Sequence, residues 1–264
     1  MKIRNRLWLD LGEVGSLLTN FGCHQDHAVG LLMTILRNAG IEITLASTRN
    51  IFSKQQLLRK FKSVDMLIMS VLSINYPFAV KCARLFKNVN PYGVVVVGGL
   101  HASVAIDEMV SVKEFDYICK GPGENIIIDL ATEPEKFGRL VEATGAKLMA
   151  DWPDIDRTLW PKPTVNIPGM MNTWPLEKYS IEEAPSATIL TSRVCPWQCA
   201  FCNESSYIPN MVRKPVEKVI EELNNIDKRF GPFNSVIIHD SNFFQNPKWI
   251  REWIFKYPKL ANSN

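Results

Sequence analysis

The fold is decided by residues 64–100, VDMLIMSVLSINYPFAVKCARLFKNVNPYGVVVVGGL. The nearly continuous apolar run over 64–71 and the β-branched run over 94–97 are typical of strands that are buried on both faces of a parallel sheet. Residues 77–86, between these runs, have the apolar spacing of a helix. The order strand, helix, strand therefore predicts a βαβ unit.

The same alternation continues on both sides of this unit. Further strands are expected over 6–9, 41–45 and 115–119, and further helices over 27–38, 53–61 with Ser53 as N-cap, and 124–131. This order predicts a doubly wound α/β domain of the flavodoxin or Rossmann kind. Ligands of such sheets bind at the carboxyl ends of the strands.

Downstream of this domain the composition changes. Six of the sixteen prolines fall within 151–187, where they prevent regular helix and sheet. A second βα pattern then begins, with strands expected over 187–191 and 235–239, and with helices after Pro215 and over 247–255. We expect a first domain over 1–145, an ordered Pro- and Trp-rich connection over 146–186, and a second domain over 187–264.

Composition excludes several classes of protein. The net charge is only +3, and Lys and Arg are scattered, so nucleic acid is not expected as a partner. The N-terminal residues lack the apolar core of a signal peptide, and the longest apolar runs are too short to cross a bilayer. A cytoplasmic protein without a membrane partner is expected.

Three of the six cysteines are clustered in 191–205, TSRVCPWQCAFCNES, where Cys195, Cys199 and Cys202 have the spacing C-x3-C-x2-C. Three thiolates on one short loop can bind three corners of a [4Fe–4S] cluster, which normally takes four Cys, so one iron stays open for another ligand. A zinc site with His239 as a fourth ligand is an alternative. An electron-carrying cluster is another, and it would require a fourth Cys.

This loop, placed directly after a strand, resembles the signature of the radical S-adenosylmethionine superfamily. The resemblance implies that the open iron chelates the methionine end of S-adenosylmethionine, which one electron then cleaves to a 5′-deoxyadenosyl radical. It implies that Phe201 packs near the adenine and that Asp240 lies near the methionine amine. Phe201 could instead anchor the loop in the core, and Asp240 could cap a helix or turn.

Three short motifs fall at expected strand ends of the first domain. Glycines there would let the backbone approach a flat ligand, and a serine could bind a nucleotide-like tail. The Ser-x-Leu and Gly-Gly motifs, in this order, resemble the cobalamin-binding domain, and the Gly-x-Gly-Glu motif resembles the cobalamin-dependent radical branch. The cofactor-binding residues that this resemblance implies are Ser70, Leu72, Gly98, Gly99, His101, Gly121, Gly123 and Glu124.

The roles that the resemblance implies for His27 and Glu124 have alternatives. The family pattern Asp-x-His-x-x-Gly is imperfect here, because Asp26 directly precedes His27 and Gln25 occupies the position of the family's acid. His27 is therefore either a cobalt ligand or a partly solvated residue near a helix start. Glu124 could equally be an acid in the first turn of a helix, where the dipole favours it. His101 is expected near the ligand edge.

Taken together, these motifs resemble the cobalamin-binding radical S-adenosylmethionine family. The resemblance implies an enzyme with a [4Fe–4S] cluster, S-adenosylmethionine and cobalamin that transfers methyl groups to an unactivated carbon, with electrons from a flavodoxin or ferredoxin. Its substrate would be a small molecule or a peptide. Oxidative cyclisation or rearrangement and a non-enzymatic cobalamin-binding module are the alternatives. Only 62 residues follow Cys202, so we expect the chain to be truncated within the catalytic barrel of the family.

Overall fold

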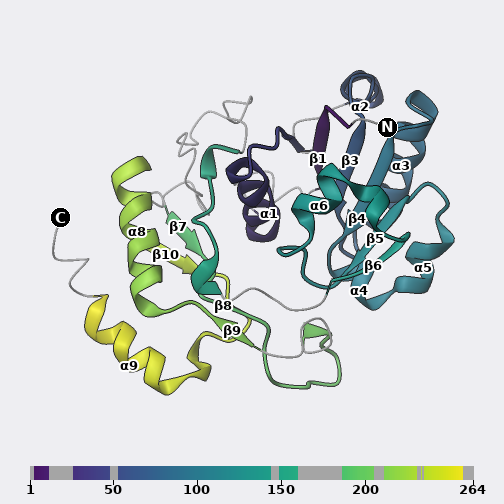
Figure 1. Ribbon diagram of the computed structural model, residues 1–264. Coiled ribbons are helices and arrows are strands. Elements are labelled where there is room, and N and C mark those ends of the chain that lie inside the picture. The colour runs from purple at the N-terminus through teal and green to yellow at the C-terminus, as the bar shows by residue number, and fades with distance from the viewer. Residues whose placement is uncertain are drawn as a thin grey trace.

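The computed structural model describes residues 3–11, 26–47, 53–143, 149–159, 186–204, 211–230, 233 and 235–257. These residues form a larger unit around a six-stranded sheet and a smaller unit that contains the cysteine loop (Figure 1).

The larger unit contains a parallel sheet with the strand order β2-β1-β3-β4-β5-β6. All five neighbouring pairs are parallel, which confirms the predicted doubly wound fold. This order is the flavodoxin-like one with a sixth strand added at the β5 edge. β6 was not predicted from the sequence. The strands are β1 (Arg6–Asp10), β2 (Thr44–Ser47), β3 (Met66–Ser70), β4 (Val94–Gly98), β5 (Tyr117–Lys120) and β6 (Leu140–Glu142).

Helices cover both faces of the sheet because each central strand is apolar on both sides. Leu67 and Met69 of β3 point into one core, whereas Met66 and Ile68 point into the other. The first core is closed by α2 (Lys54–Phe61), α3 (Tyr76–Val89), α4 (Leu100–Val104) and α5 (Ile106–Ser111). The second is closed by α1 (His27–Asn38) and α6 (Ile127–Thr132) (Figure 1). The short helices α4 and α5 were not predicted from the sequence.

Local signals account for most helix ends. The predicted cap at Ser53 is confirmed: its side chain accepts a hydrogen bond from the Gln56 amide at 3.2 Å, within a capping box. Asp26 caps α1 through two backbone amides. The prediction of a helix start at Glu124 is wrong, because α6 begins at Ile127 and Glu124 lies in the turn before it. The alternative of Glu124 as a first-turn acid fails with it.

The smaller unit begins with two βα units, as predicted for the start of a barrel. β7 (Ser186–Ile189) and β10 (Ser235–Ile238) pair in parallel, and α8 (Val216–Phe230) connects them. Helix α9 (Pro247–Lys256) follows β10 and stacks Trp249 on Trp253, with ring centroids 5.6 Å apart. A short antiparallel pair, β8 (Ser192–Arg193) with β9 (Val212–Arg213), joins the two ends of the cysteine loop.

Residues 149–159, which belong to the expected connection, contact both units. Asp156 pairs with Arg37 of α1 at 3.0 Å and with Arg229 of α8 at 3.5 Å. Arg157 is buried and donates to the side chain and the carbonyl of Thr188 in β7. Apart from Ser186, which begins β7, the remainder of the connection lies in 146–148 and 160–185, outside the described residues, so the domain bounds stay a prediction.

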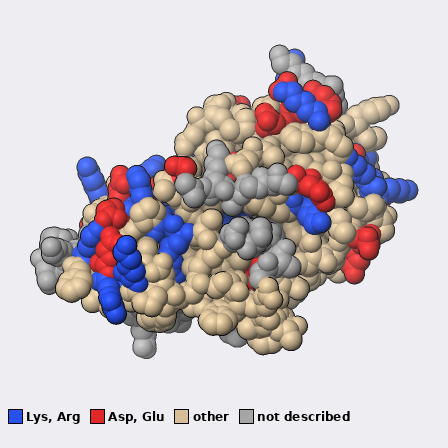
Figure 2. Space-filling view, turned by 60° about the horizontal axis from the view of Figure 1, so that its bottom comes forward, with Lys and Arg blue, Asp and Glu red and all other residues tan. Residues whose placement is uncertain are grey.

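The charged side chains are mixed in sign where the smaller unit meets solvent. Figure 2 shows Lys and Arg interspersed with Asp and Glu at the end formed by α8 and α9. Pairs such as Lys218 with Glu221 and Lys256 with Glu217 account for this pattern. Among the described helices, none combines the length and apolar character of a membrane span.

Candidate functional site

The topological switch point of the larger unit lies between β1 and β3, at their carboxyl ends. These strands are neighbours in the sheet, but the chain leaves β1 toward α1 on one face and β3 toward α3 on the other. Such a point, where the connections diverge, is where doubly wound sheets bind ligands. The loop over 12–25 that follows β1 lies outside the described residues.

The Ser-x-Leu and Gly-Gly motifs lie side by side at this edge. Ser70 pairs in register with Gly98, and the Val71 amide donates to the Gly98 carbonyl at 2.8 Å. Gly99 has φ +93°, and a Cβ there would lie 2.7 Å from the Val71 nitrogen. The neighbouring strand end therefore requires a glycine at 99, and the close approach to a flat ligand expected from the sequence stays a prediction.

The Gly-Pro-Gly-Glu segment is joined to the same edge. The Ser103 hydroxyl donates to the Gly99 carbonyl at 3.2 Å and accepts from the Gly121 amide at 3.0 Å, so it links the two glycine loops. Gly121 also has φ +93°, and a Cβ would lie 2.6 Å from the Ala143 carbonyl oxygen. A Cβ on Gly123 would only touch Leu32, at 3.4 Å. Ser103 was missed because its role depends on two loops that meet only in the fold.

Two apolar side chains of these motifs are exposed. Leu72 and Leu100 follow the carboxyl ends of β3 and β4 and are 40% and 37% exposed. A corrin ring presents large apolar faces, and burial of such faces on exposed leucines is favourable. This edge therefore offers exposed apolar surface, and contact of the three motifs with a cobalamin stays a prediction.

The histidines that the sequence analysis considered as site residues have different surroundings. His101 is buried; its Nδ1 lies 3.0 Å from the Ser73 hydroxyl, and its ring lies 4.5 Å from that of Tyr76. These contacts hold His101 against α3. His27, at the start of α1, lies with its ring centroid 5.4 Å from that of His239, which follows β10. His27 thus faces the smaller unit, and its role as a cobalt ligand stays a prediction.

The cysteine loop starts from a constrained backbone. β8 and β9 pair Arg193 with Val212, and the Lys214 amide donates to the Thr191 carbonyl at 2.8 Å. Val194, directly before Cys195, has φ +70° and is buried. A β-branched residue rarely adopts this conformation, which costs about 1–3 kcal/mol and persists only where the surroundings impose it.

The three clustered thiols are free and differ in exposure. Cys195 and Cys202 are half-buried and Cys199 is exposed. Within the described parts of the chain, no three His, Cys, Asp or Glu side chains are gathered as a metal site would require. The donor set itself fits an iron–sulfur cluster, because three thiols on eight residues leave one iron open. Ligation by these thiols stays a prediction, as does the zinc alternative.

Asp240 holds the base of this loop. Its carboxylate is fully buried and accepts from the amides of Thr191 and Ser192 at 2.6 and 3.0 Å and from both hydroxyls. Arg213 lies 3.7 Å away, over the Trp249 ring. Burial lowers the pKa of Arg213, and the charge of Asp240 opposes this shift. Asp240 therefore has a structural role in the loop, and its predicted contact with an amine is untested.

The aromatic residue of the loop does not anchor it. Phe201 is 92% exposed, so the alternative that it packs in the core is wrong. Its expected place beside an adenine stays a prediction. Of the cysteines outside the loop, Cys82 and Cys119 are buried, and burial raises the pKa of each thiol to about 12. Cys23 lies outside the described residues.

One ion pair connects the cysteine loop to the strand-end motifs. Glu124 is buried, and its Oε1 contacts Nη1 of Arg193, two residues before Cys195. Trp152 lies 5.5 Å from the same guanidinium. The sequence motif identified Glu124, but nothing in the local sequence identified Arg193 as its partner.

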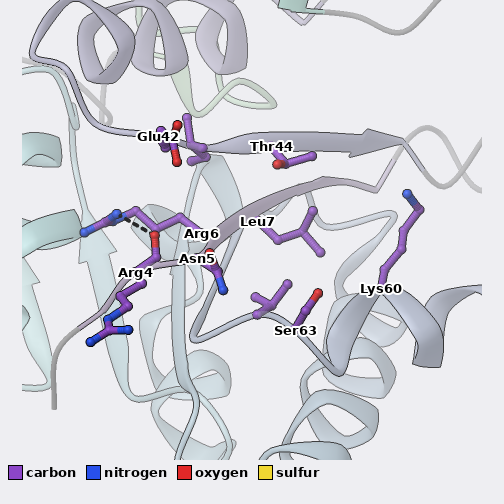
Figure 3. Close-up of a pocket in the computed structure, with 10 residues that line it drawn as sticks. Arg4, Asn5, Arg6, Leu7, Glu42, Thr44, Lys60 and Ser63 are labelled. Carbon is purple, nitrogen blue, oxygen red and sulfur yellow. Dashed lines mark hydrogen bonds between the residues drawn. The ribbon is translucent and has the colours of Figure 1, made fainter.

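A cavity of about 390 Å³ lies at the opposite edge of the sheet (Figure 3). It is lined by the amino ends of β1 and β2, with Arg4, Arg6 and Glu42 among its residues. Arg6 Nε donates a hydrogen bond to the carbonyl of Ala131 at 2.8 Å, so the protein itself supplies a partner for this guanidinium. The strand-end motifs are not part of this cavity.

Comparison with known proteins shows what the larger unit is similar to. Residues 17–131 match the sequence model of the B12 binding domain. The solved structure of the cobalamin-dependent S-adenosylmethionine radical enzyme OxsB with aqua-cobalamin bound has the same fold, with a TM-score of 0.64 at 17% identity; the alignment covers 96% of this chain and 37% of that one.

Curated relatives are similar over most of this chain. An uncharacterized methyltransferase of Pyrococcus horikoshii, PH0819, is 28% identical over 73% of the chain, and a hopanoid C-3 methylase of Methylococcus capsulatus is 27% identical over 81%. An anaerobic magnesium-protoporphyrin IX monomethyl ester cyclase of Rubrivivax gelatinosus is 24% identical over 74%. The matched part makes up 43%, 42% and 36% of these relatives, so the chain spans about two fifths of their length.

Proposed function

We propose, from the premise that residues 17–131 are a B12 binding domain, that the chain is the cofactor-binding part of a cobalamin-dependent radical S-adenosylmethionine methyltransferase. Cobalamin would bind at the carboxyl ends of β3, β4 and β5. A [4Fe–4S] cluster would be held by Cys195, Cys199 and Cys202. The transfer of a methyl group to an unactivated carbon is the reaction we propose.

The observation that carries this proposal is the contact between the two predicted cofactor motifs. Arg193, which begins the cysteine loop, pairs with Glu124, which ends the Gly-Pro-Gly-Glu segment of the B12 binding domain. A cobalamin-binding module alone would not need a cysteine loop at this edge. Two relatives named for methyl transfer support the choice of reaction.

The chain's own residues have distinct tasks in this proposal. Cofactors carry the radical and methyl-transfer chemistry when bound, and the protein supplies their placement. Leu72 and Leu100 offer apolar surface at the strand ends. Asp240 and the β8–β9 pair hold the base of the cysteine loop. Substrate, small molecule or peptide, and an electron donor such as flavodoxin or ferredoxin would be required as partners.

Anaerobic reconstitution tests both cofactor sites at once. The chain would be incubated with iron, sulfide and hydroxocobalamin, desalted, and assayed for iron and for the visible corrinoid bands. The expected result is about four irons per chain with retained corrinoid. Replacement of Cys195, Cys199 and Cys202 by Ala should remove the iron, whereas Cys82→Ala is the matched control and should retain it.

A second pair of variants tests the cobalamin edge. Leu72→Glu places a charge on the exposed apolar surface and should weaken corrinoid retention without loss of iron. Val110→Glu changes a similarly exposed residue on α5, 41% exposed, and should have no effect.

The reconstitution of the unmodified chain has two other informative outcomes. Corrinoid without iron would identify a cobalamin-binding module, and iron without corrinoid would contradict the cobalamin site.

A further inference from the structure

The contact between Glu124 and Arg193 is more enclosed than the ion pair of Asp156 with Arg229, which also reaches the smaller unit. The side chains of Glu124 and Arg193 are 2% and 16% exposed. The pair formed by Asp156 and Arg229 is by contrast 23% and 58% exposed. A buried carboxylate is strongly destabilised when its partner is removed, whereas an exposed pair contributes little.

Glu124 depends on this one cation. Its Oε1 contacts Arg193, and its Oε2 is buried without a hydrogen-bond partner among the described residues. The Arg193 guanidinium also lies 5.5 Å from the ring of Trp152, which packs against the core of the larger unit. Arg193 is therefore held by two residues that belong to, or pack on, the larger unit, although it is itself part of β8.

The position of Arg193 determines what this contact can do. The next residue is Val194, with φ +70°, and the one after it is Cys195. An unfavourable backbone conformation persists only when the residues around it are fixed. The β8–β9 pair fixes Arg193 within the smaller unit, and Glu124 fixes it relative to the larger one. In Figure 1 this strand pair lies between β7–β10 and the six-stranded sheet.

We propose that Glu124 and Arg193 are positioning residues: their ion pair fixes the start of the cysteine loop against the strand-end edge of the B12 binding domain. The inference rests on the proposed function for its purpose, since it would set the placement of the two cofactors relative to each other. Neither residue needs to touch a cofactor for this role. With this ion pair formed, the start of the cysteine loop is held fixed relative to the larger unit.

Hydrogen exchange of the cofactor-free chain, followed by mass spectrometry, tests the pair directly. Glu124→Gln and Arg193→Gln should each speed exchange of the amides in 194–204 by on the order of tenfold, because a charged hydrogen bond is lost. Exchange in β4, over 94–98, should not change. The double variant should be no faster than either single variant, because both remove the same interaction.

Matched variants separate positioning from general stability. Arg229→Gln breaks the exposed pair with Asp156 and should leave exchange in 194–204 unchanged. Arg193→Lys keeps the charge and should restore part of the protection, and it serves if Arg193→Gln does not fold. Unchanged exchange in 194–204 in both single variants, additive effects in the double variant, or faster exchange throughout the chain would each overturn the proposal.

Reconstituted protein supplies a second readout. The electron paramagnetic resonance spectrum of the reduced cluster with S-adenosylmethionine should broaden or shift in Glu124→Gln at unchanged iron content. An identical spectrum would contradict a positioning role. If the unmodified chain binds neither iron nor corrinoid, the proposed function fails, but the exchange result on the ion pair stands by itself.

Discussion

Replacement of Asp240 should destabilise the smaller unit before it affects any ligand. Its fully buried carboxylate accepts hydrogen bonds from two backbone amides and two hydroxyls, all from Thr191 and Ser192. These bonds tie the end of β10 to the residues that lead from β7 into the cysteine loop. Arg213 has its counter-charge there, and its buried Nε and Nη1 atoms have no hydrogen-bond partner among the residues that the structure describes.

The magnitude follows from the groups left behind. In Asp240→Ala the amides of Thr191 and Ser192 lose their acceptor, at about 1–3 kcal/mol each. The hydroxyls can rotate to other partners, but Arg213 becomes a buried charge without its carboxylate. We expect a loss of about 3–5 kcal/mol, the range for breaking one partner from a buried charged network. Asp240→Asn keeps one carbonyl acceptor for the two amides and should lose about 2 kcal/mol.

Urea unfolding followed by tryptophan fluorescence measures this loss, since Trp249 and Trp253 lie in the core of the smaller unit. The midpoint should fall at an unchanged slope. Glu221→Ala, an exposed change in the same unit, is the control and should stay within about 0.5 kcal/mol of the unmodified chain. Asp240→Asn with unchanged stability but lost binding of S-adenosylmethionine would refute this reasoning, because the carboxylate would then serve the ligand and not the loop.

Three further perturbations test the rest of the structure. Gly99→Ala should lower the unfolding free energy by about 2–5 kcal/mol, because φ at this position is positive and the added Cβ would contact Val71. Gly40→Ala is the control, because Gly40 also has a positive φ but has open space around it. An equal loss of stability in both variants would contradict the steric argument. Burial raises the pKa of Asp156, but hydrogen bonds from Thr158 and Arg37 and the charge of Arg229 outweigh it, so the pKa lies below its ordinary value. The Asp156 contribution to stability should therefore be complete above about pH 4 and be lost as the pH falls further; acid unfolding curves that do not differ between the unmodified chain and Asp156→Asn would contradict this. A thiol reagent at pH 8 should label Cys199 in the folded chain well before Cys119, whose pKa is raised to about 12 by burial, and equal rates by mass spectrometry would show that the buried thiol is accessible.

Local patterns predicted most of the elements. The helix over 27–38 has the expected bounds, and the strands near 66–70 and 94–98 lie where the apolar runs placed them. The missed elements are short and include α4, α5 and β6, of three to six residues, and the two-residue strands β8 and β9. Segments of this length carry too few residues for a period to show, and their contacts with the sheet stabilise them.

The predicted site residues were located by motif, but their partners were not. Ser70 and Gly98 are neighbours because β3 and β4 pair in register. A contact of this kind can be anticipated once the order of the strands in the sheet is known. The requirement for glycine at 99 comes from Val71, 28 positions away, and the partner of Glu124 is Arg193, 69 positions away.

The alternation of apolar runs was enough to specify a parallel doubly wound sheet, because strand and helix periods are properties of neighbouring residues. The spacing of Cys195, Cys199 and Cys202 is likewise a local property, and the cluster that it predicts stays a prediction. Which carboxylate holds that loop, and which cation meets Glu124, were decided only when β10, β8 and the turn before α6 came together in space. Ion pairs and buried hydrogen bonds act over a few ångströms, so residues 49 and 69 positions apart reveal their pairing only in the tertiary structure.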